Sequence, residues 1–150
     1  MLTNPLTIEA HEEIWLLKQP FRISRGTRAE AQVVVVTVSD GEHIGRGEAV
    51  PLARYNQSTA SVKTQLELVK GEKNVDRQCL QELMPAGAAR NALDCALWDL
   101  EAKVSGKRAW ELAEIPIAPE VETSFTISLN TPVKMGTAAS ANANLPIFPA

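Results

Sequence analysis

The chain has 150 residues, which suits one ordinary domain or a small domain joined to part of another. Hydrophobic residues make up 45% and charged residues 22%, values of a globular rather than a disordered protein. The net charge is −3, no cluster of Lys and Arg occurs on any predicted face, and no apolar run reaches the roughly 18–20 residues of a membrane span. We therefore expect neither a nucleic acid nor a membrane as partner.

Two cysteines, Cys79 and Cys95, fall in segments with helical periodicity and take part in no CxxC or histidine pairing. Cysteines of this kind are typically buried thiols of a protein from a reducing compartment. The chain does not open with a basic segment followed by an apolar core, so we expect no secretory signal. The sequence predicts two buried free thiols and a cytoplasmic location.

The first fifty residues have the pattern of an antiparallel meander. Apolar and polar residues alternate over 6–10, the period of a half-buried strand. A β-branched run within 32–39 suits a central strand buried on both sides. Asp40-Gly41 is a strong hairpin signal before a returning strand over 43–49.

Glycines and predicted loops add detail to this meander. Gly45 and Gly47 lie in the returning strand, where glycine indicates a bulge or the close approach of another backbone. The segments 21–31 and 51–58 are aperiodic and rich in polar residues, so we predict loops there.

Two helices are predicted next. Ser58 or Thr59 is a suitable N-cap for the first, which ends near Gly71. Its apolar side carries Val62, Leu66 and Val69. A short helix over 75–83 follows, with Leu80 and Leu83 expected to point inward.

The longest periodic segment runs over 85–112. Pro85 suits the start of a helix, where a missing N–H costs nothing, and Gly106 suits a left-handed stop. One helical face carries Ala89, Leu93, Ala96, Leu97, Leu100 and Val104. Trp98 points almost opposite that face, so we expect this helix to be covered from two directions.

A linker with two prolines separates this part from a strand predicted over 121–129 and an Ala-rich helix over 133–144. A strand followed by a helix has the order of an opening βα unit. We therefore predict one domain over 1–115, and a linker with the start of a second domain over 116–150.

Three stretches resemble a known family: GEAVPLARY (47–55), PAGAARNALDCALWDLEAK (85–103) and TSFTISLNTP (123–132). They are similar to the N-terminal third of dipeptide epimerases, the L-Ala-D/L-Glu epimerase branch of the enolase superfamily, muconate-lactonizing-like subgroup. The resemblance covers about residues 5–145. It implies an α+β fold: a capping domain with a three-stranded antiparallel meander and helices, followed by the first βα unit of a truncated TIM-like barrel.

The resemblance also implies a chemistry and a partner, a small-molecule dipeptide. In the family, Mg²⁺ binds the substrate carboxylate and stabilises an enediolate, because removing an α-proton places negative charge on the carboxylate oxygens. Two lysines on opposite faces of the substrate carry out the 1,1-proton transfer. These groups come from the C-terminal ends of barrel strands.

The catalytic parts of this family are missing from the chain. Where the family has its Lys-x-Lys base motif, residues 145–150 read LPIFPA, and the last lysine is Lys134. No aspartate follows Asp99 and no histidine follows His43, so the metal ligands of later strands are absent. We predict no catalytic and no metal-binding residue, no bound Mg²⁺ and no activity of this fragment alone; a shifted reading frame or a truncated gene is our hypothesis for its origin.

The resemblance assigns substrate-binding candidates to three places. Arg25 matches the capping-loop arginine that approaches the distal carboxylate of the dipeptide, a role suited to guanidinium; the alternative is a solvated loop arginine. Ser24 belongs to the same loop. Tyr55 is expected either to close over substrate or to pack on the cap, and Thr123 to project from the first barrel strand. Phe21, Ile23 and Thr126 are further candidates on these segments.

Other interpretations stay open at this stage. A muconate cycloisomerase or an o-succinylbenzoate synthase of the same subgroup has the same capping domain, and a non-catalytic binding module is a further alternative. A surface that a barrel would cover is exposed in this chain, and unpaired apolar strand edges favour association. We therefore expect the chain to self-associate.

Overall fold

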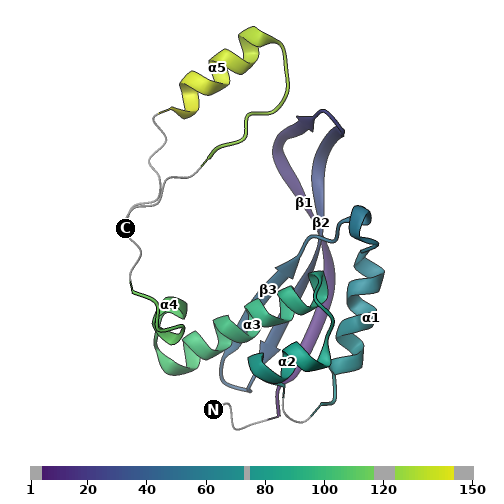
Figure 1. Ribbon diagram of the computed structural model, residues 1–150, viewed down its shortest axis with the longest axis vertical. Helices are drawn as coiled ribbons and strands as arrows, with labels where there is room; N and C mark the ends of the chain where they lie inside the picture. Colours follow the sequence, from purple (N-terminus) through teal and green to yellow (C-terminus); the bar gives the residue numbers. More distant parts are fainter. Residues whose placement is uncertain (1–4, 73–74, 117–123, 144–150) are drawn as a thin grey trace. The chain divides into compact units, whose positions relative to one another are not determined.

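The structure is a computed structural model that describes residues 5–72, 75–116 and 124–143. Its elements, in chain order, are β1 (Thr7–Ile23), β2 (Gly26–Ser39), β3 (Ile44–Ala49), the 3-10 turn η1 (Ala53–Tyr55), α1 (Thr59–Val69), α2 (Arg77–Leu83), α3 (Ala88–Ser105), α4 (Ala109–Leu112) and α5 (Pro132–Asn142) (Figure 1). None of the helices in these ranges is long and apolar enough to cross a membrane.

The chain divides into two compact units. The first comprises Met1–Trp15 and Gln32–Ile117, and the second comprises Leu16–Ala31 and Ala118–Ala150. The domain boundary between residues 115 and 116 stays a prediction, because the second unit also takes in a stretch from the beginning of the chain.

The first unit contains a three-stranded sheet in the order β1-β2-β3, which confirms the predicted meander. β2 and β3 are antiparallel, in continuous register from Val34 opposite Ala49 to Ser39 opposite Ile44. The turn between them is stabilised by Asp40, whose Oδ1 accepts hydrogen bonds from the backbone N–H groups of the two residues before β3. The hairpin predicted from Asp40-Gly41 is therefore confirmed.

The core lies between this sheet and the helices. Val34, Val36 and Val38 of β2 alternate toward it, as expected for a strand with one buried face. The helices contribute Val62, Leu66, Val69, Leu80, Ala89, Ala92, Leu93, Ala96, Leu97 and Leu100. The prediction that β2 is buried on both sides is wrong at Val35 and Thr37, which keep partial exposure on the opposite face.

Helix α3 lies directly on β3. A Cβ atom added at Gly45 would be 2.6 Å from the backbone nitrogen of Leu100, and one added at Gly47 would be 2.8 Å from that of Ala96. Real Cβ atoms essentially never come so close, so only glycine permits this contact. The predicted close backbone approach at the two glycines is confirmed.

The helix ends agree with the sequence in part. Ser58 caps α1, its Oγ accepting a hydrogen bond from the N–H of Ser61 at 3.1 Å, as predicted. In α2 Leu80 is buried, whereas Leu83 is 43% exposed and the prediction for it is wrong. The helix ends there, and the following residue, Met84, occupies the inward position instead.

Helix α3 begins at Ala88, with Gly87 as its N-cap, rather than at Pro85. Proline favours an extended conformation in the residue before it, and Met84 is extended and buried, so residues 85–87 lead from the core to the helix start. The left-handed stop predicted at Gly106 is confirmed by its φ of 67°.

The second covering of α3 comes from α2. The Arg77 guanidinium lies 3.4 Å from the centre of the Trp98 ring and forms a 2.9 Å ion pair with Glu101. Cys95, on the same side of α3, is exposed, so the prediction of a buried thiol is wrong there; Cys79 is partly buried. Both cysteines are free.

The second unit contains the hairpin of residues 16–31, here called the arm. The predicted loop over 21–31 is wrong, because β1 and β2 continue through it and leave only Ser24 and Arg25 as the turn. Most of the arm is exposed on both faces, so its strands lack the apolar alternation by which strands are recognised, although their backbones pair.

The rest of the second unit is Ala118–Ala150, of which the structure describes residues 124–143. The strand predicted over 121–129 is wrong in its described part, which forms no strand there and instead bonds to the arm through single hydrogen bonds. Thr131 caps α5 with Pro132 in its first turn. The predicted linker after Pro116 and the LPIFPA stretch lie outside the described residues.

Candidate functional site

The turn at the tip of the arm carries two of the predicted site residues. Ser24 and Arg25 occupy its two positions and both are exposed, so the fold brings these neighbours together at the point where β1 reverses into β2. Phe21 is partly buried and Ile23 is largely exposed. The tip thus offers a guanidinium and a hydroxyl to a ligand, beside an apolar side chain.

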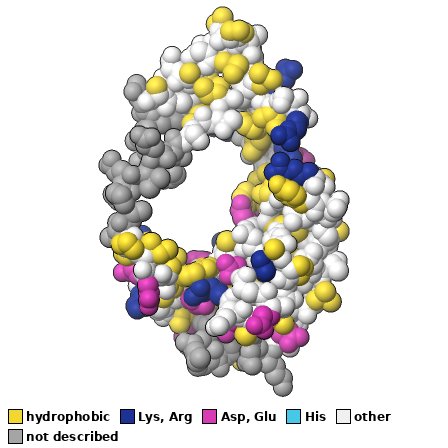
Figure 2. Space-filling view, in the orientation of Figure 1, with side chains coloured by type: hydrophobic (Ala, Val, Ile, Leu, Met, Phe, Trp, Pro, Cys, Tyr) yellow, Lys and Arg dark blue, Asp and Glu magenta, His cyan; other side chains and the backbone are white. Residues whose placement is uncertain are grey.

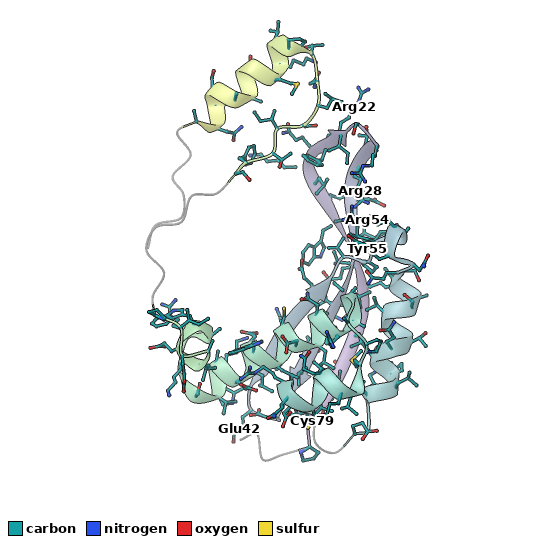
Figure 3. The ribbon with its side chains drawn as sticks, in the orientation of Figure 1. Arg22, Arg28, Glu42, Arg54, Tyr55 and Cys79 are labelled. Atoms are coloured by element: carbon teal, nitrogen blue, oxygen red, sulfur yellow. The ribbon has the colours of Figure 1, made fainter. Side chains whose placement is uncertain are left out.

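The arm is strongly basic. It carries four cations (Lys18, Arg22, Arg25 and Arg28) and one anion (Glu30), a net charge of +3 in a chain whose total is −3. Dark-blue side chains lie along it in Figure 2, and Figure 3 labels Arg22 and Arg28 on its two strands. All four cations are exposed, so the arm attracts anions over about a Debye length of 8–10 Å. The expectation that no face carries a basic cluster is wrong here, because a segment taken for a loop has no predicted face.

Residues 20–22 of β1, here called the stem of the arm, are bonded to the segment 124–130. The hydroxyl of Ser128 accepts a hydrogen bond from the N–H of Arg22 at 2.9 Å and donates one to the carbonyl of Pro20 at 3.3 Å. The N–H of Leu129 donates to the carbonyl of Arg22 at 2.8 Å. Residues more than a hundred positions apart in the sequence are therefore held side by side.

Tyr55 lies in the first unit, at the end of η1 (Figure 3). Its side chain is 60% exposed, and the Arg54 guanidinium lies 4.7 Å from the ring centre. Asn56, in the left-handed conformation, ends the turn, and the side chain of Gln57 accepts a hydrogen bond from the N–H of Leu52. The exposed ring argues against packing on the cap, and its role toward substrate stays a prediction.

The remaining candidates divide between described and undescribed residues. Thr126 is exposed in the segment 124–130, whereas Thr123 lies outside the described residues. The second unit contains Ser24, Arg25 and Thr126, and the first unit contains Tyr55.

The chemistry of the thiols gives no support for a nucleophile. A hydrogen bond to Asp76 raises the pKa of Cys79, and partial loss of hydration, together with the nearby Asp94 carboxylate, raises the pKa of Cys95. Both groups are therefore held as thiols rather than as reactive thiolates at neutral pH.

The family described as mandelate racemase / muconate lactonizing enzyme, N-terminal domain, matches residues 6–113. The chain belongs to this family. Both the resemblance to dipeptide epimerases and the capping-domain fold expected from it are confirmed.

Two known enzymes are similar to this chain over part of their length. The L-Ala-D/L-Glu epimerase of Escherichia coli (strain K12) is 45% identical over 136 residues, which are 89% of this chain and 42% of that protein. The N-acetyl-D-glutamate racemase of Pseudoalteromonas sp is 37% identical over 119 residues, 77% of this chain and 38% of that protein. The chain thus spans about two fifths of the length of these relatives.

Solved structures of related proteins have the same fold as this chain. An enolase family member from Agrobacterium tumefaciens with homology to dipeptide epimerases, with bound sodium and L-Ala-L-Glu, matches with a TM-score of 0.77 and 45% identity, over 93% of this chain and 43% of that one. A dipeptide epimerase from Enterococcus faecalis complexed with Mg and L-Leu-L-Tyr has a TM-score of 0.79 over 93% of this chain and 42% of that one; at 21% identity it shows the fold alone.

The residues at hand do not fit the family's magnesium ion. Across 5–72, 75–116 and 124–143, no three side chains of His, Cys, Asp or Glu are grouped so that they could hold a metal ion. Mg²⁺ is bound through carboxylate oxygens, so this part of the family's domain offers it no site.

Proposed function

We propose that this chain is the substrate-recognising N-terminal part of a dipeptide epimerase whose substrate carries an acidic side chain, of the L-Ala-D/L-Glu type. The observation that carries the proposal is Arg25, exposed at the tip of a basic arm. The 45% identity to the Escherichia coli epimerase, and to a structure with bound L-Ala-L-Glu, supports the substrate class.

The roles of the individual residues follow from their chemistry. The Arg25 guanidinium offers two parallel N–H groups to the distal carboxylate, and Ser24 offers a further donor. The rest of the arm raises the local concentration of an anionic substrate. Tyr55 and Thr123 are proposed as further substrate contacts, Tyr55 through its exposed ring.

The proton transfer itself is proposed to need groups outside this chain. Mg²⁺, in the family reaction, stabilises the charge that develops on the substrate carboxylate. The sequence over 145–150 lacks the Lys-x-Lys motif, so we expect the 150-residue chain, with residues 1–115 as the cap, to show no turnover alone. Free thiols support a cytoplasmic setting for the enzyme.

A chimera tests the proposal. In it, the aligned part of this chain replaces the matching stretch of the Escherichia coli relative, and epimerisation of L-Ala-L-Glu is followed with added Mg²⁺. We expect turnover, and for Arg25→Ala a loss of kcat/KM of about 10- to 100-fold, the range for hydrogen bonds to a charged group. Arg28→Gln is the matched control, because it removes the same charge from the arm but not from the tip. A folded chimera without turnover would contradict the proposal.

A second candidate function has a specific observation behind it. The racemase at 37% identity is named for N-acetyl-D-glutamate, which shares the glutamate carboxylate with L-Ala-D/L-Glu. The same tip arginine would serve both substrates. Offering the chimera N-acetyl-D-glutamate, L-Ala-L-Glu and the apolar L-Leu-L-Tyr separates them: a preference for the last would remove both acidic assignments.

Self-association is proposed on the exposed apolar residues of β1. Ile14 is 61% and Leu16 81% exposed, in a strand at the edge of the sheet. Exposed apolar edge strands pair with other chains. Light scattering on the 150-residue chain should show species larger than a monomer, and replacing Leu16 with Lys should reduce them.

A further inference from the structure

Little apart from hydrogen bonds holds the arm at its stem. Most of its side chains are exposed, and an isolated two-stranded hairpin is at best marginally stable in water. Pro20 has no N–H, and the outer edge of β1 there leaves the Pro20 carbonyl and both backbone groups of Arg22 in need of partners.

Ser128 and its neighbour satisfy all three of these groups. The Ser128 hydroxyl accepts from the N–H of Arg22 at 2.9 Å and donates to the carbonyl of Pro20 at 3.3 Å, while the N–H of Leu129 donates to the carbonyl of Arg22 at 2.8 Å. A hydroxyl is both donor and acceptor, which is what a bridge between an N–H and a C=O on one strand edge requires. Ser128 is itself partly buried.

The bridge lies close to the recognition turn. Arg25 follows Arg22 by three residues along the same hairpin, so fixing both backbone groups of Arg22 limits how the tip moves. A loop that is ordered before the ligand arrives does not pay for its ordering at binding.

We infer that Ser128 is a positioning residue for substrate recognition: its hydroxyl locks the stem of the basic arm so that Arg25 at the tip is held ready for the carboxylate of an acidic substrate. The locking of the arm stands on the hydrogen bonds alone. Its consequence for the substrate rests on the function proposed above.

Hydrogen exchange on the 150-residue chain tests the locking. For Ser128→Ala we expect the arm amides around Arg22 to exchange about three- to tenfold faster, the effect of losing one or two ordinary hydrogen bonds. Ser128→Thr keeps the hydroxyl and should restore slow exchange. Ser124→Ala is the matched control, because it makes the same replacement at an exposed residue of the same segment.

Exchange in α3 shows whether the effect is local. Amides of α3 around Leu97, in the other unit, should exchange equally in all these variants. Unchanged arm exchange in Ser128→Ala, or equal acceleration in the arm and in α3, would overturn the locking.

Kinetics of the chimera test the consequence. Ser128→Ala should raise KM for L-Ala-L-Glu about three- to tenfold with little change in kcat, and should add little when Arg25 is already replaced by Ala, because the two residues act through one contact. Fully additive losses would overturn the positioning role. A chimera inactive in every form would instead count against the proposed function, and the exchange measurement would still decide whether Ser128 locks the arm.

Discussion

The strands β1 and β2 run through two very different environments. In the first unit they belong to a sheet on which α3 rests so closely that backbone meets backbone at Gly45 and Gly47. In the arm the same two strands carry exposed side chains and are bonded through single hydrogen bonds to the segment 124–130. The first region is stabilised by burial and the second by a few polar contacts. One pair of strands therefore contributes both to a packed sheet and to an exposed turn that carries polar side chains.

The largest expected effect compares a leucine from each region. Leu97 is fully buried in the core, so Leu97→Ala should lower the free energy of unfolding by about 3 kcal/mol, through lost burial and the cavity left behind. Leu16 in the arm is 81% exposed, and Leu16→Ala should change it by less than about 0.5 kcal/mol. Urea denaturation followed by circular dichroism measures both, and equal losses would remove the contrast.

A second prediction concerns the contact of α3 with β3. Gly47→Ala places a methyl group 2.8 Å from the backbone nitrogen of Ala96, and the helix must move, at a cost of about 2–3 kcal/mol. Gly136→Ala in α5 is the control, since nothing lies within 4 Å of the added atom and alanine favours a helix. A Gly47→Ala protein with the denaturation midpoint of the parent would show that this contact is looser than described.

The smallest effect is a dependence on pH at the start of α2. Asp76 caps this helix, and a hydrogen bond from the N–H of Cys79 holds its pKa below the usual value of 3.8. A lowered folded pKa adds stability that is present above the unfolded pKa and is lost as pH falls through the folded one. Asp76→Ala should therefore cost about 1 kcal/mol at pH 7 and less near pH 3.

Ser58→Ala is the matched control for that experiment. It removes the cap of α1, whose hydroxyl does not titrate, so its cost should be similar at both pH values. The midpoints of the three proteins at pH 7 and pH 3 decide the matter. A pH-independent cost for Asp76→Ala would mean that its carboxylate does not act as the cap.

The sequence predicts the first unit well because burial leaves a pattern. Val34, Val36 and Val38 alternate as their positions in the sheet require, and Gly47 marks the place where a helix touches the strand. The errors there are local: Leu83 falls at the last turn of a short helix, where the chain leaves the inward face, and Met84 replaces it.

The sequence does not reveal the strands of the arm, because these strands are exposed. Exposed strands have no apolar alternation, so a segment rich in Arg and Ser is easily taken for a loop. Arg25 was identified only through the family resemblance, since nothing in its neighbours distinguishes it from a solvated arginine. Ser128 left no signal at all, because a hydroxyl that bridges residues 106 positions away has no local pattern.

Trp98 gives this protein a built-in optical reporter. Trp15 and Trp110 are 42% and 39% exposed, so water already surrounds much of their rings in the folded chain. Trp98 instead lies beneath the guanidinium of Arg77, at the joint between α2 and α3. Changes in tryptophan emission on unfolding will therefore report mainly the separation of these two helices, and no label is needed to follow it.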